Sequence, residues 1–167
     1  MVLTVPKGKN MQLPKRKLPR LSRFDYSSEN YYYVTICTHN RKDLFGTPDN
    51  LTVYGKIAKK HLLEIESHYD GICIDKYVIM PNHIHAIIVI GCEPDAERSR
   101  PFPTLETILG LYKSGVSREI HKISPQLKVW QKSYFDKIIR NNDAYLEVCR
   151  YLEENPIKWI IGEENDY

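Results

Sequence analysis

The sequence lacks long apolar stretches, and this absence narrows the class of protein. No apolar run in the 167 residues approaches the ~18 residues that a membrane-spanning helix needs. The N-terminal segment has no apolar core of the kind found in secretory signals. The composition, 42% hydrophobic and 27% charged, is that of an ordinary globular domain. We therefore expect one folded domain that acts in the cytoplasm.

Cysteine is scarce, and its spacing fits no common metal or redox motif. The four cysteines are Cys37, Cys73, Cys92 and Cys149, and no two of them form a C-x-x-C pair. Two of the four, Cys37 and Cys73, fall inside apolar segments with the character of strands. We expect buried, reduced thiols, because disulfides are uncommon in cytoplasmic proteins.

Several nucleotide-handling motifs are also absent. Without the phosphate-binding pattern G-x-x-x-x-G-K-[ST], the chain gives no sign of an ATP site. A hydrolase of the histidine-triad type needs His-x-His-x-His, but the third position is occupied by Ile87. A two-histidine phosphoesterase needs a second His-x-Thr or His-x-Ser repeat, and the sequence has none. These absences disfavour both hydrolase classes.

Positive charge is concentrated in an N-terminal arm. Residues 1–24 hold seven of the 24 lysines and arginines and no acidic residue, whereas the rest of the chain carries 17 basic and 21 acidic residues. Three prolines, Pro6, Pro14 and Pro19, argue against a helix in the arm. Basic, extended arms commonly contact nucleic-acid backbones, but a solvated tail has the same composition.

The hydrophobic periodicity predicts alternating strands and helices. Strands are expected at 30–38, 72–80, 83–90 and around 134–139, and helices at 52–68, at 105–121 after a Thr104 cap, and from Asn141 or Asn142 to Asn155, where Pro156 ends the last helix. This order is the split βαβ, or ferredoxin-like, arrangement of the α+β class. It predicts an antiparallel sheet with helices on its faces and one additional C-terminal helix.

Two histidines stand out within the strand predicted at 83–90. Because alternate side chains of a strand point to the same face, His83 and His85 present two imidazoles side by side. Such a pair supplies two ligands of a divalent metal site, although each residue taken alone could equally be an ordinary core histidine. The third ligand must come from another element.

The last predicted helix offers that ligand together with a nucleophile. Tyr151 and Asn155 are four residues apart and therefore share one helix face, next to the apolar stripe that should meet the sheet. The amide oxygen of Asn155 is a neutral metal ligand, and the hydroxyl of Tyr151 can form a covalent phosphodiester. Alternatively, Tyr151 is an ordinary aromatic residue at the margin of the helix, and Asn155 is only a residue at the end of the helix. Tyr134 is a second candidate nucleophile, but it has no amide partner at matching spacing.

These motifs resemble those of the HUH single-tyrosine transposases, and among them the REP-associated tyrosine transposases. His83-Ile84-His85 matches the family's His-hydrophobic-His motif, and Tyr151 and Asn155 match its Tyr-x-x-x-Asn or Tyr-x-x-x-Gln helix motif. Further similar stretches occur in order at residues 25–27, 33–38, 44–46, 109–114 and 130–136. The resemblance covers roughly residues 24–160. One departure is Lys137, where many relatives have histidine.

The resemblance implies a DNA-nicking and strand-joining enzyme. Tyr151 would attack single-stranded DNA, become linked to the 5′-phosphate and release a 3′-hydroxyl, with Mg²⁺ or Mn²⁺ held by His83, His85 and Asn155. Relatives recognise imperfect hairpins with single-stranded guides, and they act as monomers or homodimers. A non-catalytic, ferredoxin-like nucleic-acid-binding module is the alternative.

The domain boundaries and the DNA contacts follow from the same comparison. We expect a basic arm at residues 1–23, the transposase domain at 24–161 and a short acidic tail at 162–167. Cations that contact phosphates and an aromatic residue that stacks on unpaired bases would bind the DNA. The candidates are Lys15, Arg16, Lys17, Arg20, Arg23, Tyr26, Lys113 and Lys137.

Overall fold

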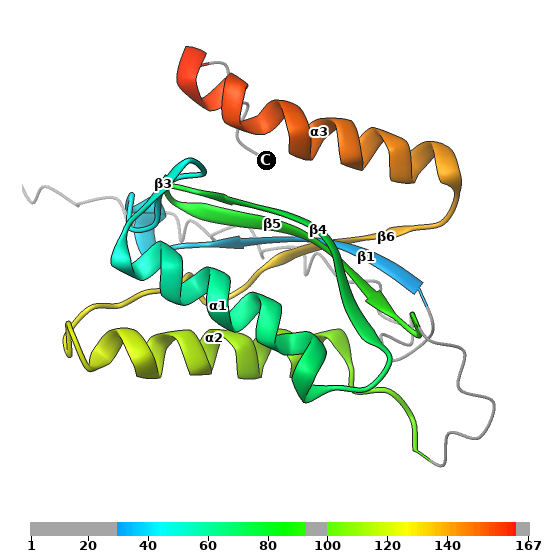
Figure 1. Ribbon diagram of the computed structural model, residues 1–167, viewed down its shortest axis with the longest axis horizontal. Helices are drawn as coiled ribbons and strands as arrows, with labels where there is room; N and C mark the ends of the chain where they lie inside the picture. Colours follow the sequence, from blue (N-terminus) through cyan, green and yellow to red (C-terminus); the bar gives the residue numbers. More distant parts are fainter. Residues whose placement is uncertain (1–29, 93–99, 163–167) are drawn as a thin grey trace, which may run out of the picture.

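A single antiparallel sheet of four strands, in the order β4-β5-β1-β6, forms the centre of the fold. The structure, a computed structural model, describes residues 30–92 and 100–162. Two helices, α1 and α2, cover one face of the sheet, and α3 lies across the other (Figure 1). The main elements are β1 (Asn30–Cys37), α1 (Val53–His68), β4 (Ile72–Met80), β5 (His83–Ile90), α2 (Leu105–His121), β6 (Phe135–Ile139) and α3 (Asn142–Ile161).

The alternation of side chains in the central strand β5 divides the interior into two cores. Ile84, Ala86, Ile88 and Ile90 join the larger core under α1 and α2. The residues between them face α3, where Ile87 and Val89 pack with side chains of that helix. Since all eight residues of β5 are buried, the strand reads as a continuous apolar run in the sequence. The two histidines interrupt that run on the α3 face only.

The predicted fold class and the order of the main elements are confirmed. The strands at 72–80 and 83–90 and the helix at 105–121 have the expected bounds. Thr104 caps α2, since its hydroxyl accepts a hydrogen bond from the Thr107 backbone N–H at 3.2 Å. Between β1 and α1 the chain forms a one-turn 3₁₀ helix, η1 (His39–Arg41), and then a short hairpin of β2 (Gly46–Thr47) and β3 (Asn50–Leu51). Within the described residues, no helix is long and apolar enough to cross a membrane.

The end of the last helix was predicted wrongly. Asn141 caps α3 as expected, but the helix continues through Pro156 to Ile161. Proline has no N–H to donate to the carbonyl four residues earlier, so its place inside a helix is costly. Beyond the proline, Trp159 packs against the core on the α3 face, and Gly162 closes the helix with a left-handed φ of 71°. Apolar burial beyond the proline offsets the lost hydrogen bond.

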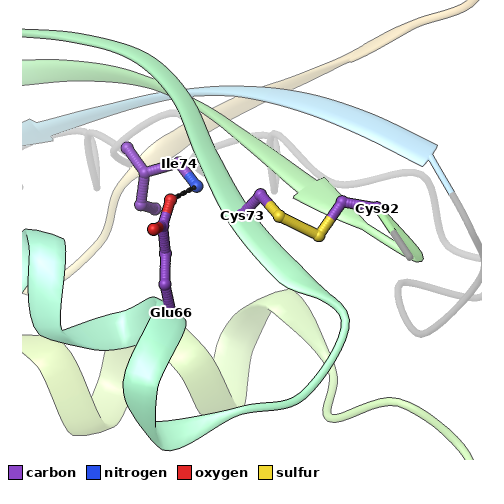
Figure 2. Close-up of a disulfide and its surroundings, with 4 residues drawn as sticks. All are labelled: Glu66, Cys73, Ile74 and Cys92. Carbon is purple, nitrogen blue, oxygen red and sulfur yellow. Dashed lines mark hydrogen bonds between the residues drawn. A yellow bond between two sulfur atoms is a disulfide. The ribbon is translucent and has the colours of Figure 1, made fainter.

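The prediction that all four cysteines are reduced was also wrong. Cys73 near the start of β4 forms a disulfide with Cys92 just after β5 (Figure 2). The antiparallel register pairs Cys73 with Val89, and the chain after β5 then returns Cys92 toward it, leaving the two Cα atoms 6.0 Å apart. That separation suits a disulfide. Cys37 and Cys149 are free thiols.

A β-bulge in β4 lies beside this disulfide. The register with β5 shifts between Ile74 and Lys76, so that Asp75 is an extra residue. The carboxylate of Glu66, on α1, accepts a hydrogen bond from the Ile74 backbone N–H at 2.7 Å (Figure 2). On the α3 side, the hydroxyl of Tyr145 donates to the Asp75 carboxylate, also at 2.7 Å. Bulges redirect side chains in this way, and here the bulge ties β4 to helices on both faces.

Candidate active site

The two histidines of β5 lie side by side on the face of the sheet that α3 covers. Their ring centroids are 4.5 Å apart, and the exposed fractions of His83 and His85 are only 2% and 3%. Both side chains are therefore inside the protein, in a position where apolar residues would satisfy the core equally well. Buried histidines need polar partners, and each of these has one at Nδ1.

The partners at Nδ1 differ between the two rings. For His83, the partner is the side-chain oxygen of the preceding residue, Asn82, at 2.7 Å. For His85, the partners are the hydroxyls of Tyr33 and Thr35, both at 2.8 Å and both from the adjacent strand β1. An amide oxygen only accepts hydrogen bonds, so the Nδ1 of His83 carries a proton.

Helix α3 brings Tyr151 and Asn155 to the same place. The ring of Tyr151 meets that of His85 edge-on, with the centroids 5.3 Å apart and the planes at 75°. Asn155, one turn further, is 1% exposed, and neither its Oδ1 nor its Nδ2 has a hydrogen-bond partner within residues 30–92 and 100–162. The two residues are part of the buried side of α3 together with Val148 and Leu152.

Burial keeps His85 neutral. Desolvation, reinforced by the positive charges that His83 and Arg41 can carry, holds the pKa of His85 well below its ordinary value. A neutral imidazole has a lone pair to offer, whereas a protonated one has none. His85 therefore presents a neutral nitrogen donor, as a metal ligand must.

The buried donor atoms fit a divalent metal ion. Among the described residues, the buried side-chain atoms without a hydrogen-bond partner include His85 Nε2 and both amide atoms of Asn155. Leaving such atoms unpaired costs about 1–3 kcal/mol each. A bound metal ion would supply a partner for them. Two imidazoles and one amide oxygen suit Mn²⁺, and Mg²⁺ less well. Within the described part of the chain, no group of three His, Cys, Asp or Glu residues is placed to hold a metal ion, and an amide such as that of Asn155 is not counted in such a group.

The last turns of α3 add a cation and an aromatic ring to the site. The ammonium group of Lys158 lies 5.7 Å from the centroid of the Tyr151 ring and 2.9 Å from a carboxylate oxygen of Glu154. The indole of Trp159 lies 6.1 Å from the His83 ring. Both contacts depend on the continuation of the helix beyond Pro156, so the site uses the segment that the sequence prediction left out of the helix.

Other candidate residues lie elsewhere. Tyr134 packs against the core under α1 and α2, on the opposite face of the sheet from the histidines. Lys113, on α2, donates to the Gln131 backbone carbonyl at 2.7 Å, and desolvation lowers its pKa. Lys137 is exposed on the edge strand β6, paired in register with Tyr33 and therefore on the face of the histidines. The remaining candidates, Lys15, Arg16, Lys17, Arg20, Arg23 and Tyr26, lie outside the described residues.

Sequence reasoning assigned no role to three residues that contact the histidines. Asn82 directly precedes His83, and this proximity was a usable signal. Tyr33 and Thr35 are two positions apart on β1, so their side chains project from the same face. The register between β1 and β5 decides which histidine they meet. That register cannot be read from the sequence alone.

A family model described as "Transposase IS200 like" matches residues 26–155. The chain belongs to this IS200-like transposase family. The family of the chain defines it as a DNA transposase. A protein of Haemophilus influenzae, described only as uncharacterized, is 34% identical over an alignment 167 positions long, which covers 90% of this chain and 93% of that protein.

Solved structures show the same fold. The REP-associated tyrosine transposase bound to a REP hairpin superimposes with a TM-score of 0.57 at 18% identity, over 83% of this chain and 73% of that one. A protein of Deinococcus radiodurans R1 that carries a transposase assignment gives a TM-score of 0.50 at 16% identity, over 81% of this chain and 95% of the other. At these identities the likeness establishes the architecture, whereas the family model establishes the family.

Proposed function

We propose that this transposase nicks and rejoins single-stranded DNA, with Tyr151 as the nucleophile and a divalent metal ion as cofactor. The observation that carries the proposal is the edge-on contact between the rings of Tyr151 and His85, with centroids 5.3 Å apart, beside the unpartnered amide of Asn155. A nucleophile, two imidazoles and an amide oxygen thus converge from β5 and α3. A non-catalytic DNA-binding module has no use for this combination.

His83, His85 and Asn155 would hold the metal ion, either Mn²⁺ or Mg²⁺. When bound, the ion supplies Lewis-acid polarisation of a phosphate oxygen. The chain's own residues exclude water around the ligands, since the three side chains are at most 3% exposed. They also orient both imidazoles through hydrogen bonds at Nδ1, and burial keeps His85 neutral.

The proposed reaction exchanges one phosphodiester for another. The hydroxyl oxygen of Tyr151 attacks the phosphorus of the scissile phosphate, a phosphotyrosine bond forms, and the bond to the 3′-oxygen breaks. The phenol proton is released to solvent as the phenolate forms, and the departing 3′-oxygen takes up a proton to leave as a hydroxyl. Lys158, 5.7 Å from the ring centroid, contributes positive charge that favours the phenolate. Because the phosphodiester energy is retained, a 3′-hydroxyl can reverse the step without ATP.

The substrate we propose is a hairpin with single-stranded flanks. The REP hairpin bound to the structurally similar transposase motivates this choice. On this chain, exposed Phe135 and Lys137 lie on the edge strand β6, on the face of the histidines, and they offer a stacking surface and a cation for unpaired nucleotides. The basic arm would add phosphate contacts through Lys15, Arg16, Lys17, Arg20 and Arg23. Since the whole candidate site lies within one chain, a monomer suffices.

A covalent-adduct assay tests the proposal. The full chain is incubated with Mn²⁺ and a hairpin that carries single-stranded flanks and a label at its 3′ end, and the products are separated on a denaturing protein gel. We expect a labelled adduct that Tyr151→Phe abolishes and Tyr134→Phe retains. His83→Ala should reduce it at least tenfold at limiting Mn²⁺.

Two outcomes would overturn the assignment. Loss of the adduct in Tyr134→Phe, with retention in Tyr151→Phe, would move the nucleophile to the other face of the sheet. Tight binding of the hairpin with no adduct in the wild-type protein at any Mn²⁺ or Mg²⁺ concentration would instead favour a non-catalytic DNA-binding module.

A further inference from the structure

Two hydroxyl groups of β1 converge on one nitrogen atom of His85. The side-chain oxygens of Tyr33 and Thr35 each lie 2.8 Å from Nδ1, and the Thr35 hydroxyl also donates to that of Tyr33 at 3.4 Å. The ring of Tyr33 stacks on the imidazole, with centroids 5.6 Å apart and an interplanar angle of 23°. The imidazole is thus fixed both in its plane and at one edge.

The sheet register produces this arrangement. Thr35 is the cross-strand partner of His85, so the two side chains project from the same face at neighbouring positions. Tyr33, two residues earlier on β1, shares that face and is long enough to reach back diagonally. Both β1 residues pair on their other side with the edge strand β6, which keeps β1 in the interior of the sheet.

The two hydroxyls determine which nitrogen of His85 carries the proton. If the proton were on Nε2, a buried N–H would have no acceptor, because Nε2 has no hydrogen-bond partner among the described residues. If it is on Nδ1, the N–H has two hydroxyl oxygens available as acceptors at 2.8 Å. Unpaired buried donors are rarer and costlier than unpaired acceptors. The Nδ1–H tautomer is therefore favoured, and it leaves the Nε2 lone pair available.

We propose that Tyr33 and Thr35 are positioning residues that hold His85 as the Nδ1–H tautomer, with its Nε2 lone pair available to the metal ion. They do for His85 what Asn82 does for His83. The proposal rests on the proposed function, since it assigns the metal-ligand role to His85. Tyr33 has a second contact that matters here: its ring meets that of Tyr151 edge-on, with centroids 6.4 Å apart. The same residue therefore borders both the ligand and the nucleophile.

The two hydroxyls are redundant, which gives the proposal a distinctive signature. Tyr33→Phe keeps the ring contacts with His85 and Tyr151 and removes one hydroxyl, and Thr35→Val removes the other while keeping the side-chain shape. Either remaining hydroxyl can accept the proton of Nδ1. We therefore expect each single variant to change Mn²⁺ affinity less than about threefold, and the double variant to lower it by about 10- to 100-fold.

The first test needs no variant of the β1 residues and no metal. The metal-free protein is labelled with ¹⁵N-histidine, and the ring nitrogen signals of His85 are assigned by their loss in His85→Gln among the six histidines. We expect a protonated Nδ1 and an unprotonated Nε2. A protonated Nε2 would overturn the proposal, whether or not the protein binds metal or cleaves DNA.

The second test compares Mn²⁺ affinity and adduct formation. The matched control is Tyr54→Phe, which also removes a hydroxyl hydrogen bond, 2.6 Å to Ser124, but on the other face of the sheet. We expect raised Mn²⁺ to restore adduct formation in the double variant, as a defect confined to metal binding requires. An unchanged Mn²⁺ affinity in a folded double variant would overturn the proposal. The wild-type protein could also form no adduct and still bind Mn²⁺ with an affinity that falls only in the double variant. That result would overturn the proposed reaction and leave the positioning role of Tyr33 and Thr35 intact.

Discussion

The ring of Tyr151 lies edge-on against the ring of His85, with centroids 5.3 Å apart and planes at 75°. The two residues are 66 positions apart in the sequence, on α3 and β5, and belong to the same chain. The contact places the ring of a half-buried tyrosine beside a buried pair of imidazoles. For a transposase of this family, such a contact means that the residues proposed for chemistry converge without help from a second copy.

Replacing Asn155 by leucine should stabilise the metal-free protein and abolish metal binding. Both amide atoms are buried without a hydrogen-bond partner, and leucine has a similar volume with no polar atom to satisfy. We expect the free energy of unfolding in EDTA to rise by about 1–3 kcal/mol, measured by urea denaturation. Mn²⁺ affinity, measured by calorimetry, should fall at least tenfold. The exposed Glu153→Gln is the control; a less stable variant with normal Mn²⁺ affinity would contradict the ligand role.

Removing the hydroxyl of Tyr145 should loosen the helix that carries Tyr151. That hydroxyl donates to the Asp75 carboxylate at 2.7 Å, where the β4 bulge meets α3. For Tyr145→Phe we expect about 1 kcal/mol of lost stability and a thermal midpoint lowered by about 2–4 °C. Adduct formation should slow while Mn²⁺ affinity stays the same. Asp75→Asn, whose amide oxygen still accepts the bond, should be milder; a larger effect of Asp75→Asn on adduct formation would argue against this contact as the cause.

The disulfide between Cys73 and Cys92 should be detectable by counting thiols. In denaturant without reductant, only Cys37 and Cys149 should react, and all four cysteines should react after reduction. Closing a loop of this size stabilises a protein by about 3 kcal/mol in the chain-entropy estimate. We therefore expect reductant to lower the thermal midpoint of the wild-type protein and to leave that of Cys73→Ser unchanged. Four reactive thiols before reduction would show that the bond does not form.

The contact between α1 and α2 should contribute stability that is lost in acid. The carboxylate of Glu119 accepts a hydrogen bond from His61 at 2.7 Å, and this bond, together with one from Lys60, holds the pKa of Glu119 below its ordinary value. A carboxyl group with a lowered pKa in the folded state stabilises the protein above its unfolded pKa, and this contribution disappears as the pH falls through the folded pKa.

We accordingly expect Glu119→Gln to cost less than about 1 kcal/mol near pH 7, because the group is partly exposed and solvent screens its interactions. The difference from the wild-type protein should shrink below about pH 4. Urea denaturation across this pH range measures both values. A difference that grows in acid would contradict the stated cause, and added salt should reduce the effect near neutral pH.

The order of the main elements followed from local signals, but the outcome at Pro156 did not. Alternation and helical spacing act over a few residues, so β4, β5 and α2 were predicted with their observed bounds. A proline is also a local signal, and it indicated the end of a helix. Packing of Trp159 against the core beyond it reversed that indication. The disulfide escaped prediction for a similar reason, since only the β4–β5 hairpin brings its two cysteines together.

The sequence by itself determined the chemistry that is available: two histidines on one face of a strand, and a tyrosine four residues before an asparagine on a helix. These are consequences of the periods of strand and helix, which any stretch of chain carries with it. Only the tertiary structure decided that α3 packs on the face of His83 and His85, that Asn155 is left buried with no hydrogen-bond partner, and that Tyr33 and Thr35 meet His85 at Nδ1. Strand register and helix docking minimise the free energy of the whole core, to which residues far apart in the chain contribute together.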